Sequence, residues 1–169
     1  MAARILVGYA TKMGSTREIA EAVATELRER GAAVEVRPLR EVRSLDGVAA
    51  VVIGAPMYMF RLHKDAKAFL ARHRTALAAL PTAVFSLGPF HDVEKEWNEV
   101  RAVFEKEMGR FPWLTPVARE VFGGAFDPAK LAFPYTLVPA MKKMAPSDAR
   151  DWDAIRRWAA GLVPLLTRN

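Results

Sequence analysis

The sequence contains no cysteine and only three histidines. Without thiols the chain cannot form disulfides, thiolate metal sites, iron–sulfur clusters or a cysteine nucleophile. His63, His73 and His91 are too few and too scattered to indicate a histidine metal cluster, so we predict no metal site. We expect His63 and His73 to lie on the surface.

Long apolar runs are also missing, since none approaches the roughly 20 residues that a membrane-spanning helix needs. The chain starts with Met1–Arg4 and leads directly into a short core-strand pattern, without a secretory signal. We therefore expect a cytoplasmic protein. A length of 169 residues, with 51% hydrophobic and 26% charged residues, predicts a single globular domain over residues 1–169.

Several motifs are absent as well. The chain has neither the Gly-x-Gly-x-x-Gly pattern of dinucleotide folds nor the Gly-Lys-Ser/Thr ending of triphosphate loops. No Ser/His/Asp set or carboxylate pair indicates a hydrolytic site. The 25 basic and 19 acidic residues give a net charge of +6, which favours anionic partners. No nucleic-acid-binding motif accompanies this charge, so we predict no nucleic-acid partner.

What the chain does contain is a regular alternation of apolar strands with amphipathic helices. The predicted strands are Ile5–Tyr9, Ala33–Pro38, Val48–Ile53, Thr82–Leu87 and Val117–Phe122. The predicted helices are Thr16–Arg30, Lys64–Leu80, Val93–Met108 and Asp151–Leu166.

This alternation predicts an α/β fold, because apolar strands joined through helices form a parallel sheet that is covered on both faces. Five strands fit a flavodoxin-like three-layer sandwich with the strand order 2-1-3-4-5, in which Val48–Ile53 is central. In such folds the ligand lies beyond the carboxyl ends of the strands. Three loops of this chain are expected at that edge.

The first loop, Thr11–Thr16, joins an apolar strand to an amphipathic helix. Free backbone N–H groups and the positive end of the helix dipole favour an anion there, and the hydroxyls of Ser15 and Thr16 add donors. The sequence thus predicts a phosphate site. Two alternatives remain open: Ser15 or Thr16 acts only as a helix cap, and Lys12 points to solvent rather than to phosphate.

The second loop, Gly54–Phe60, follows the third strand, and the third loop, Ser86–His91, follows the fourth. Both carry aromatic side chains, which would stack on a large flat ring. Tyr58 either lies beside such a ring or forms a partly exposed rim. Phe90 and His91 either contact the ring or cap the next helix.

The segments Thr11–Thr16 and Val51–Tyr58 resemble the FMN phosphate loop and the isoalloxazine loop of the flavodoxin family. Most of the chain is similar to the subgroup around menaquinone-dependent protoporphyrinogen IX dehydrogenase. Phe122-Gly123-Gly124-Ala125 and Met141–Met144 before Asp151-Trp152 match it in order and spacing. The resemblance implies an FMN cofactor, heme biosynthesis, and electron transfer from a tetrapyrrole precursor to a quinone.

Carried onto this chain, the resemblance places FMN against residues of all three loops. The implied cofactor-binding residues are Thr11, Lys12, Met13, Gly14, Ser15, Thr16, Pro56, Met57, Tyr58, Met59, Ser86, Leu87, Gly88, Phe90 and His91. Many family members have glycine at the position of Phe60. We expect a phenylalanine to resist the backbone conformation that glycine allows there.

The leading hypothesis is an FMN-dependent oxidoreductase that passes electrons to a quinone or a similar acceptor. Protoporphyrinogen is one candidate donor. Because the flavin carries the chemistry, the pattern singles out no catalytic residue. One alternative is a flavodoxin-type electron carrier without a substrate of its own; such carriers tend to be acidic, unlike this chain. Another alternative is a binding module that has lost the flavin. Phe60 is the only feature that supports this hypothesis.

The basic surplus is concentrated near the end of the chain. Residues 130–169 hold seven Lys or Arg and three Asp, so +4 of the total +6 lies there. Within this stretch, Leu137–Met144 combines apolar groups with the paired lysines 142 and 143. Either this segment is an ordinary solvated surface, or it makes a peripheral contact with an anionic membrane at its inner face, where a lipid-soluble quinone would be available.

Overall fold

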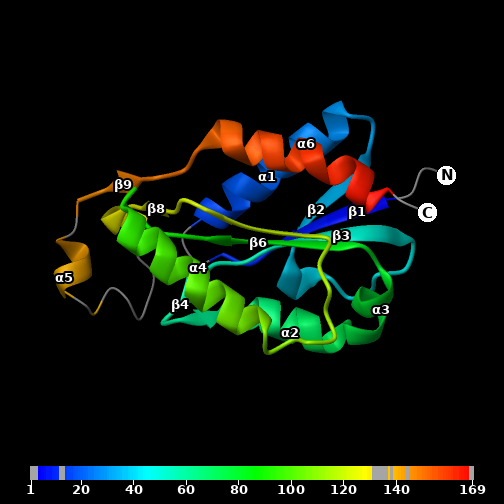
Figure 1. Ribbon diagram of the computed structural model, residues 1–169, viewed down its shortest axis with the longest axis horizontal. Coiled ribbons are helices and arrows are strands. Elements are labelled where there is room, and N and C mark those ends of the chain that lie inside the picture. Colours follow the sequence, from blue (N-terminus) through cyan, green and yellow to red (C-terminus); the bar gives the residue numbers. More distant parts are fainter. Residues whose placement is uncertain (1–3, 12–13, 131–136, 138, 144, 168–169) are drawn as a thin grey trace.

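The computed structural model describes residues 4–11, 14–130, 137, 139–143 and 145–167. Its centre is a five-stranded parallel sheet with the order β2-β1-β3-β6-β7 (Figure 1). The strands are β1 (Arg4–Tyr9), β2 (Ala33–Pro38), β3 (Val48–Gly54), β6 (Thr82–Leu87) and β7 (Ala118–Phe122). When these five strands are numbered in chain order, the sheet order is 2-1-3-4-5. The predicted flavodoxin-like sheet with a central third strand is therefore confirmed.

Helices cover both faces of the sheet (Figure 1). One layer contains α1 (Ser15–Glu29) and α6 (Trp152–Leu166), and the other contains α2 (Lys64–Arg72), α3 (Arg74–Ala79) and α4 (Glu94–Met108). The short elements are η1 (Leu39–Glu41), β4 (Met57–Tyr58), β5 (Arg61–Leu62), β8 (Ala125–Phe126), η2 (Pro128–Lys130), α5 (Pro139–Lys142) and β9 (Ser147–Asp148). None of the helices among the described residues has both the length and the apolar content that crossing a membrane requires.

The central strand β3 shows why the sheet needs two helical layers. Val51 and Ile53 pack into the core under α2, α3 and α4, whereas Ala50 and Val52 pack into the core under α1 and α6. Successive side chains of a strand point to opposite faces, so a strand that is apolar at every position must be covered on both sides.

Two expectations about the stretch after β5 were wrong. The helix predicted over Lys64–Leu80 breaks at His73, whose φ of −109° and ψ of 22° end α2 and precede α3. His63 and His73, expected on the surface, are only 4% and 8% exposed. Single imidazoles can be buried when their nitrogens are bonded: His63 Nδ1 accepts from the Asp65 N–H at 3.0 Å, and His73 Nε2 lies 3.3 Å from the Val42 carbonyl oxygen.

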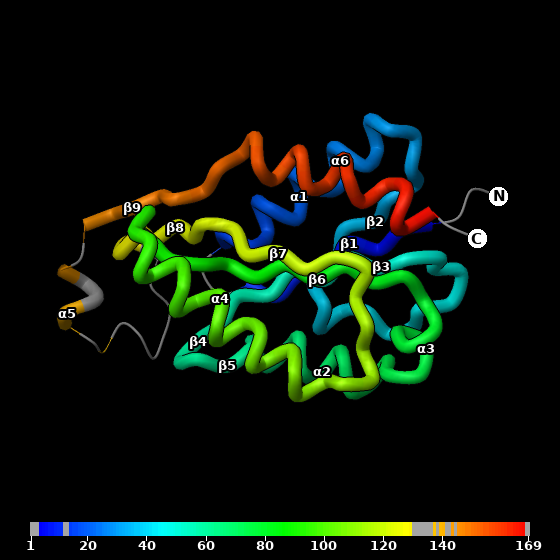
Figure 2. Tube along the Cα trace, in the orientation of Figure 1, coloured from blue at the N-terminus to red at the C-terminus, as the bar shows by residue number. Residues whose placement is uncertain are grey.

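The strand register brings the three predicted loops to one edge of the sheet. Tyr9 pairs with Gly54, Gly54 pairs with Phe85, and Leu87 pairs with Phe122. All these strands run in the same direction, so their carboxyl ends are neighbours. The trace in Figure 2 shows the β4–β5 and β8–β9 pairs beyond this same edge.

Candidate functional site

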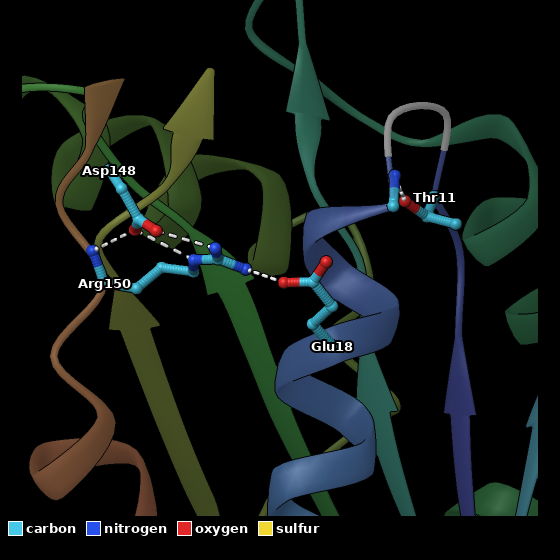
Figure 3. A network of polar contacts seen from close by, with 5 residues as sticks. Thr11, Glu18, Asp148 and Arg150 are labelled. Atoms are coloured by element: carbon cyan, nitrogen blue, oxygen red, sulfur yellow. Dashed lines mark hydrogen bonds and ion pairs between the residues drawn. The ribbon is translucent and has the colours of Figure 1, made fainter. Parts of the chain in front are cut away.

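The first loop presents an uncapped helix start. Gly14 occupies the N-cap position of α1 with φ 90°, and no side chain caps the helix. The Gly14 N–H donates to Thr11 Oγ1 at 2.8 Å, which closes the loop (Figure 3). Ser15 and Thr16 lie inside the first turn, so the capping alternative is wrong. Lys12 and Met13 lie outside the described residues.

Thr16 has the most unusual environment of this loop. Its side chain is 1% exposed, yet its hydroxyl has no hydrogen-bond partner among the described residues. Leaving a buried hydroxyl unpaired costs roughly 1–3 kcal/mol. An anion at the helix start would remove this cost by accepting a hydrogen bond.

A cavity of about 200 Å³ lies beside the same loop. Thr11 and Gly14 form one side of it, and the arginines 17 and 40 also line it together with Asp65. Two guanidinium groups near uncapped backbone N–H groups favour a phosphate, since both supply positive charge and hydrogen-bond donors. The sequence did not single out either arginine.

The second loop forms a tight hairpin. Strands β4 and β5 pair antiparallel, and Met59 and Phe60 are the two turn residues between them. Both have positive φ, 50° and 66°, as a type I′ turn requires. Asn and Gly are the usual residues there, so Phe60 adopts the conformation that we expected it to resist. Both side chains are exposed, at 83% and 76%.

The buried Glu107 of α4 holds this hairpin in place. Its side chain accepts the Leu62 N–H at 3.0 Å and pairs with Arg61 at 3.4 Å and Arg110 at 2.8 Å. The carboxylate is therefore compensated although the residue is only 2% exposed. Sequence periodicity did not reveal this contact, because Leu62 and Glu107 are 45 residues apart.

The third loop contacts the second through Ser86. The buried Ser86 hydroxyl donates to the Ala55 carbonyl oxygen at 2.7 Å, so it joins the two loops. Phe90 packs against Phe126 with ring centroids 5.4 Å apart. His91 lies 3.4 Å from Glu96 and is exposed; α4 begins at Glu94 without a side-chain cap, so His91 does not cap it.

A groove of about 500 Å³ connects the second and third loops with the first turns of α4. It brings together most of the predicted ring-binding residues and adds four residues of α4. The lining residues are Met57, Met59, Phe60, Leu87, Gly88, Pro89, Phe90, His91, Glu96, Glu99, Val100 and Val103. Tyr58 does not line this groove; its ring lies 5.7 Å from that of His63. Pro56, which was also predicted to contact the ring, is buried, and its carbonyl oxygen accepts the His63 N–H.

A network around Arg150 ties the end of the β8–β9 ribbon to α1 (Figure 3). Arg150 pairs with Asp148 at 2.7 Å and with Glu18 in the first turn of α1, and its guanidinium lies 4.8 Å from the Trp152 ring centroid. Hydrogen bonds from Arg150 lower the pKa of Asp148, and the bond to Asp148 raises the pKa of Arg150. Ser15 and Glu18 share a cavity of about 320 Å³ with this network.

The glycines after β7 make that ribbon possible. A Cβ on Gly123 would come within 1.9 Å of the Ala149 carbonyl oxygen, and the Ala149 N–H donates to the Gly124 carbonyl oxygen at 2.9 Å. The sequence stretch 125–147 has no clear periodicity, so it did not predict the Arg150 network. The pair Gly123-Gly124 was the one visible signal that two backbones approach here.

The described residues thus place an uncapped helix start and a groove at one edge of the sheet. Comparison with known proteins shows the family and the fold. The model of the family described as "Flavodoxin domain" matches residues 6–149. Protoporphyrinogen IX dehydrogenase [quinone] from Escherichia coli strain K12 is 24% identical, with 96% of each chain covered.

Solved structures show the same fold. A flavodoxin from the domain Archaea superimposes with a TM-score of 0.58 at 14% identity, covering 98% of this chain and 99% of that one. Oxidised Flavodoxin 1 from Bacillus cereus gives a TM-score of 0.59 at 18% identity, covering 97% and 99% of the two chains.

Proposed function

The chain belongs to the flavodoxin domain family, and from this premise we propose that it binds FMN and acts as an FMN-dependent oxidoreductase. Its acceptor in this proposal is a quinone or a similar molecule. Its donor is protoporphyrinogen, the substrate for which the E. coli relative is named. Bound FMN would supply the electron-transfer chemistry, while the protein binds and orients it.

One observation carries the cofactor proposal: the buried Thr16 hydroxyl without a partner at an uncapped helix start. This polar group fits the phosphate of FMN, because a phosphate oxygen would accept its hydrogen bond. The first N–H groups of α1 and the side chains of Ser15, Arg17 and Arg40 would complete the phosphate site.

The ring of FMN would lie between the second and third loops. Tyr58 and Phe90 supply aromatic surfaces there, and the groove beside them is largely apolar. A flat ring with a charged phosphate tail needs this combination of an apolar slot and a separate anion site. Both features lie at the carboxyl edge of the sheet, the usual ligand edge of such folds.

The test compares FMN with riboflavin, which has the same ring but no phosphate. We expect Ser15→Ala/Thr16→Ala to weaken FMN binding by roughly 1–3 kcal/mol through lost hydrogen bonds to the charged phosphate, and to leave riboflavin binding unchanged. Isothermal titration calorimetry with both ligands measures this difference.

Thr25→Ala is the matched control, because Thr25 lies on the same helix with its hydroxyl bonded to the exposed Glu21 carbonyl oxygen. It should bind FMN as the unmodified protein does. If the double variant binds FMN as tightly as the unmodified protein, the placement of the phosphate at this loop is wrong. A protein that takes up neither flavin would contradict the cofactor proposal as a whole.

A further inference from the structure

The groove between the hairpin turn and α4 contains a wall that the FMN loops do not account for. Glu96, Glu99, Val100 and Val103 line it from α4, and the exposed turn residues Met59 and Phe60 also line it. Met57, Leu87, Gly88 and Phe90, which would hold the flavin ring, line the same groove. The four α4 residues are the part of the lining that the three FMN loops do not supply, so a second ring bound against α4 would lie next to the flavin.

The shape of the groove is held from both sides. Glu107 fixes the hairpin to α4 through the Leu62 N–H, so the turn and the helix keep their separation. The turn itself has two large apolar residues with positive φ, a strained conformation for residues other than glycine. Strain of this kind occurs where the surrounding structure requires a particular side-chain placement. Here it places Met59 and Phe60 at the rim of the groove.

The charges of the groove are opposite to those of the protein. The whole chain has a net charge of +6. Yet the titratable residues that line the groove, among those the structure describes, are His91, Glu96 and Glu99. His91 lies 3.4 Å from Glu96, which leaves Glu99 without a cation in the lining. The two glutamates would repel a carboxylate ligand there, and the imidazole of His91 is already beside Glu96, whereas an uncharged apolar ring would lose little on entering.

We infer that the α4 side of this groove, beside the flavin ring, binds a flat, uncharged apolar ring and that Glu96 and Glu99 exclude rings that carry acidic groups. The inference rests on the proposed function and deepens it. It assigns the groove to the neutral acceptor of the quinone class and not to a porphyrin-type donor with its carboxylates. The two glutamates are specificity-determining residues, and Phe60 is part of the apolar surface that receives the ring.

The experiment is equilibrium binding to the FMN-loaded protein, measured by calorimetry with naphthoquinone and with naphthoquinone sulfonate. The two probes share a ring and differ in a fixed negative charge. We expect the unmodified protein to bind the neutral ring at least about tenfold more tightly than the sulfonate. In Glu96→Gln/Glu99→Gln this preference should fall to less than about threefold, with little change in the affinity for the neutral ring.

Glu94→Gln/Glu105→Gln is the matched control, since it removes the same charge from the same helix at residues that do not line the groove. It should keep the preference of the unmodified protein. An unchanged preference in Glu96→Gln/Glu99→Gln, or equal binding of both probes by the unmodified protein, would overturn the inference.

FMN content, measured by absorbance before each titration, separates this inference from the proposed function. A protein without flavin contradicts the proposed function. A flavin-loaded protein that does not discriminate between the probes contradicts only the inference about the groove. If Glu96→Gln/Glu99→Gln lowers FMN affinity as much as it changes probe binding, the α4 wall contacts the cofactor and the inference is overturned as well.

Discussion

At the scale of single residues, hydroxyl groups that look alike in the sequence have different roles in the site. Ser86 and Thr16 were both predicted to contact the cofactor. The Ser86 hydroxyl donates to a carbonyl oxygen of the neighbouring loop, whereas the Thr16 hydroxyl is buried without a partner. A hydrogen bond already made stabilises the loops, and a hydroxyl that lacks one remains available to a ligand.

Asp148 gives a residue-scale prediction about pH. Its bonds to Arg150 lower its pKa below the ordinary value of 3.8. A carboxyl whose pKa is lowered by folding stabilises the protein above its unfolded pKa, and this contribution is lost as the pH falls through the folded pKa. Because about half of the Asp148 side chain is exposed, solvent screening limits its contribution to roughly 0.2–1 kcal/mol.

We therefore expect Asp148→Asn to lower the free energy of unfolding at pH 7 by that amount. The difference from the unmodified protein should shrink below pH 3.8, where the Asp148 carboxyl of the unfolded chain becomes protonated, and it should vanish once the pH is also below the lowered pKa of the folded protein. Urea unfolding across pH measures it. Asp153→Asn is the control, since Asp153 pairs with Arg156 but is 75% exposed. A deficit that stays constant down to pH 2 would contradict the assignment.

At the scale of secondary-structure elements, the β4–β5 hairpin shows a local preference overridden by its surroundings. Met-Phe is a poor sequence for a turn that needs positive φ at both positions. Pairing of Met57 with Leu62 and the bond from Leu62 to Glu107 keep the turn closed. Tertiary contacts thus stabilise a backbone that the two turn residues would not adopt alone.

The hairpin prediction uses two substitutions at Phe60. Phe60→Gly should be more stable than Phe60→Ala by about 1 kcal/mol, because glycine adopts the φ of 66° without strain and alanine does not. Both variants lose the same exposed ring, so the comparison isolates the backbone. Thermal or urea unfolding of the pair measures it. Equal stabilities would show that the turn is unstrained.

At the scale of the whole molecule, the distribution of charge separates two surfaces. The last forty residues hold +4 of the net charge of +6, while the groove lining is acidic. Of the segment Leu137–Met144, the side chains of Leu137, Pro139, Ala140 and Lys143 are described, and all four are exposed. Val138 and Met144 lie outside the described residues. The membrane contact therefore remains a proposal.

Vesicle binding tests that proposal. We expect co-sedimentation with anionic vesicles at low salt and little with neutral ones, since each cation near an anionic surface contributes about 1 kcal/mol. Lys142→Gln/Lys143→Gln should weaken the binding by roughly tenfold or more. Lys95→Gln/Lys106→Gln, on α4, carries the same change in charge and should have a smaller effect. Equal and negligible binding to both kinds of vesicle would favour a water-soluble acceptor.

The sequence by itself determined the sheet and its covering layers. Continuous apolar strands must be buried on both faces, and short connections through amphipathic helices leave one strand order and one ligand edge. The long strands and α1, α4 and α6 lie within a residue or two of their predicted bounds, because their signals are periodic and local. The positions of the three loops follow from the same argument.

Tertiary structure alone decided what surrounds those loops. The pairing of Arg150 with Glu18 and of Glu107 with Leu62 joins residues far apart in the chain, and His73 likewise lies against the carbonyl oxygen of the distant Val42. Contacts of this kind arise when separate elements pack together, so no local pattern contains them. The acidic residues that α4 adds to the groove are of the same origin. The sequence predicted the helix that carries Glu96 and Glu99, and only the fold brought them into one groove with Met59 and Phe60.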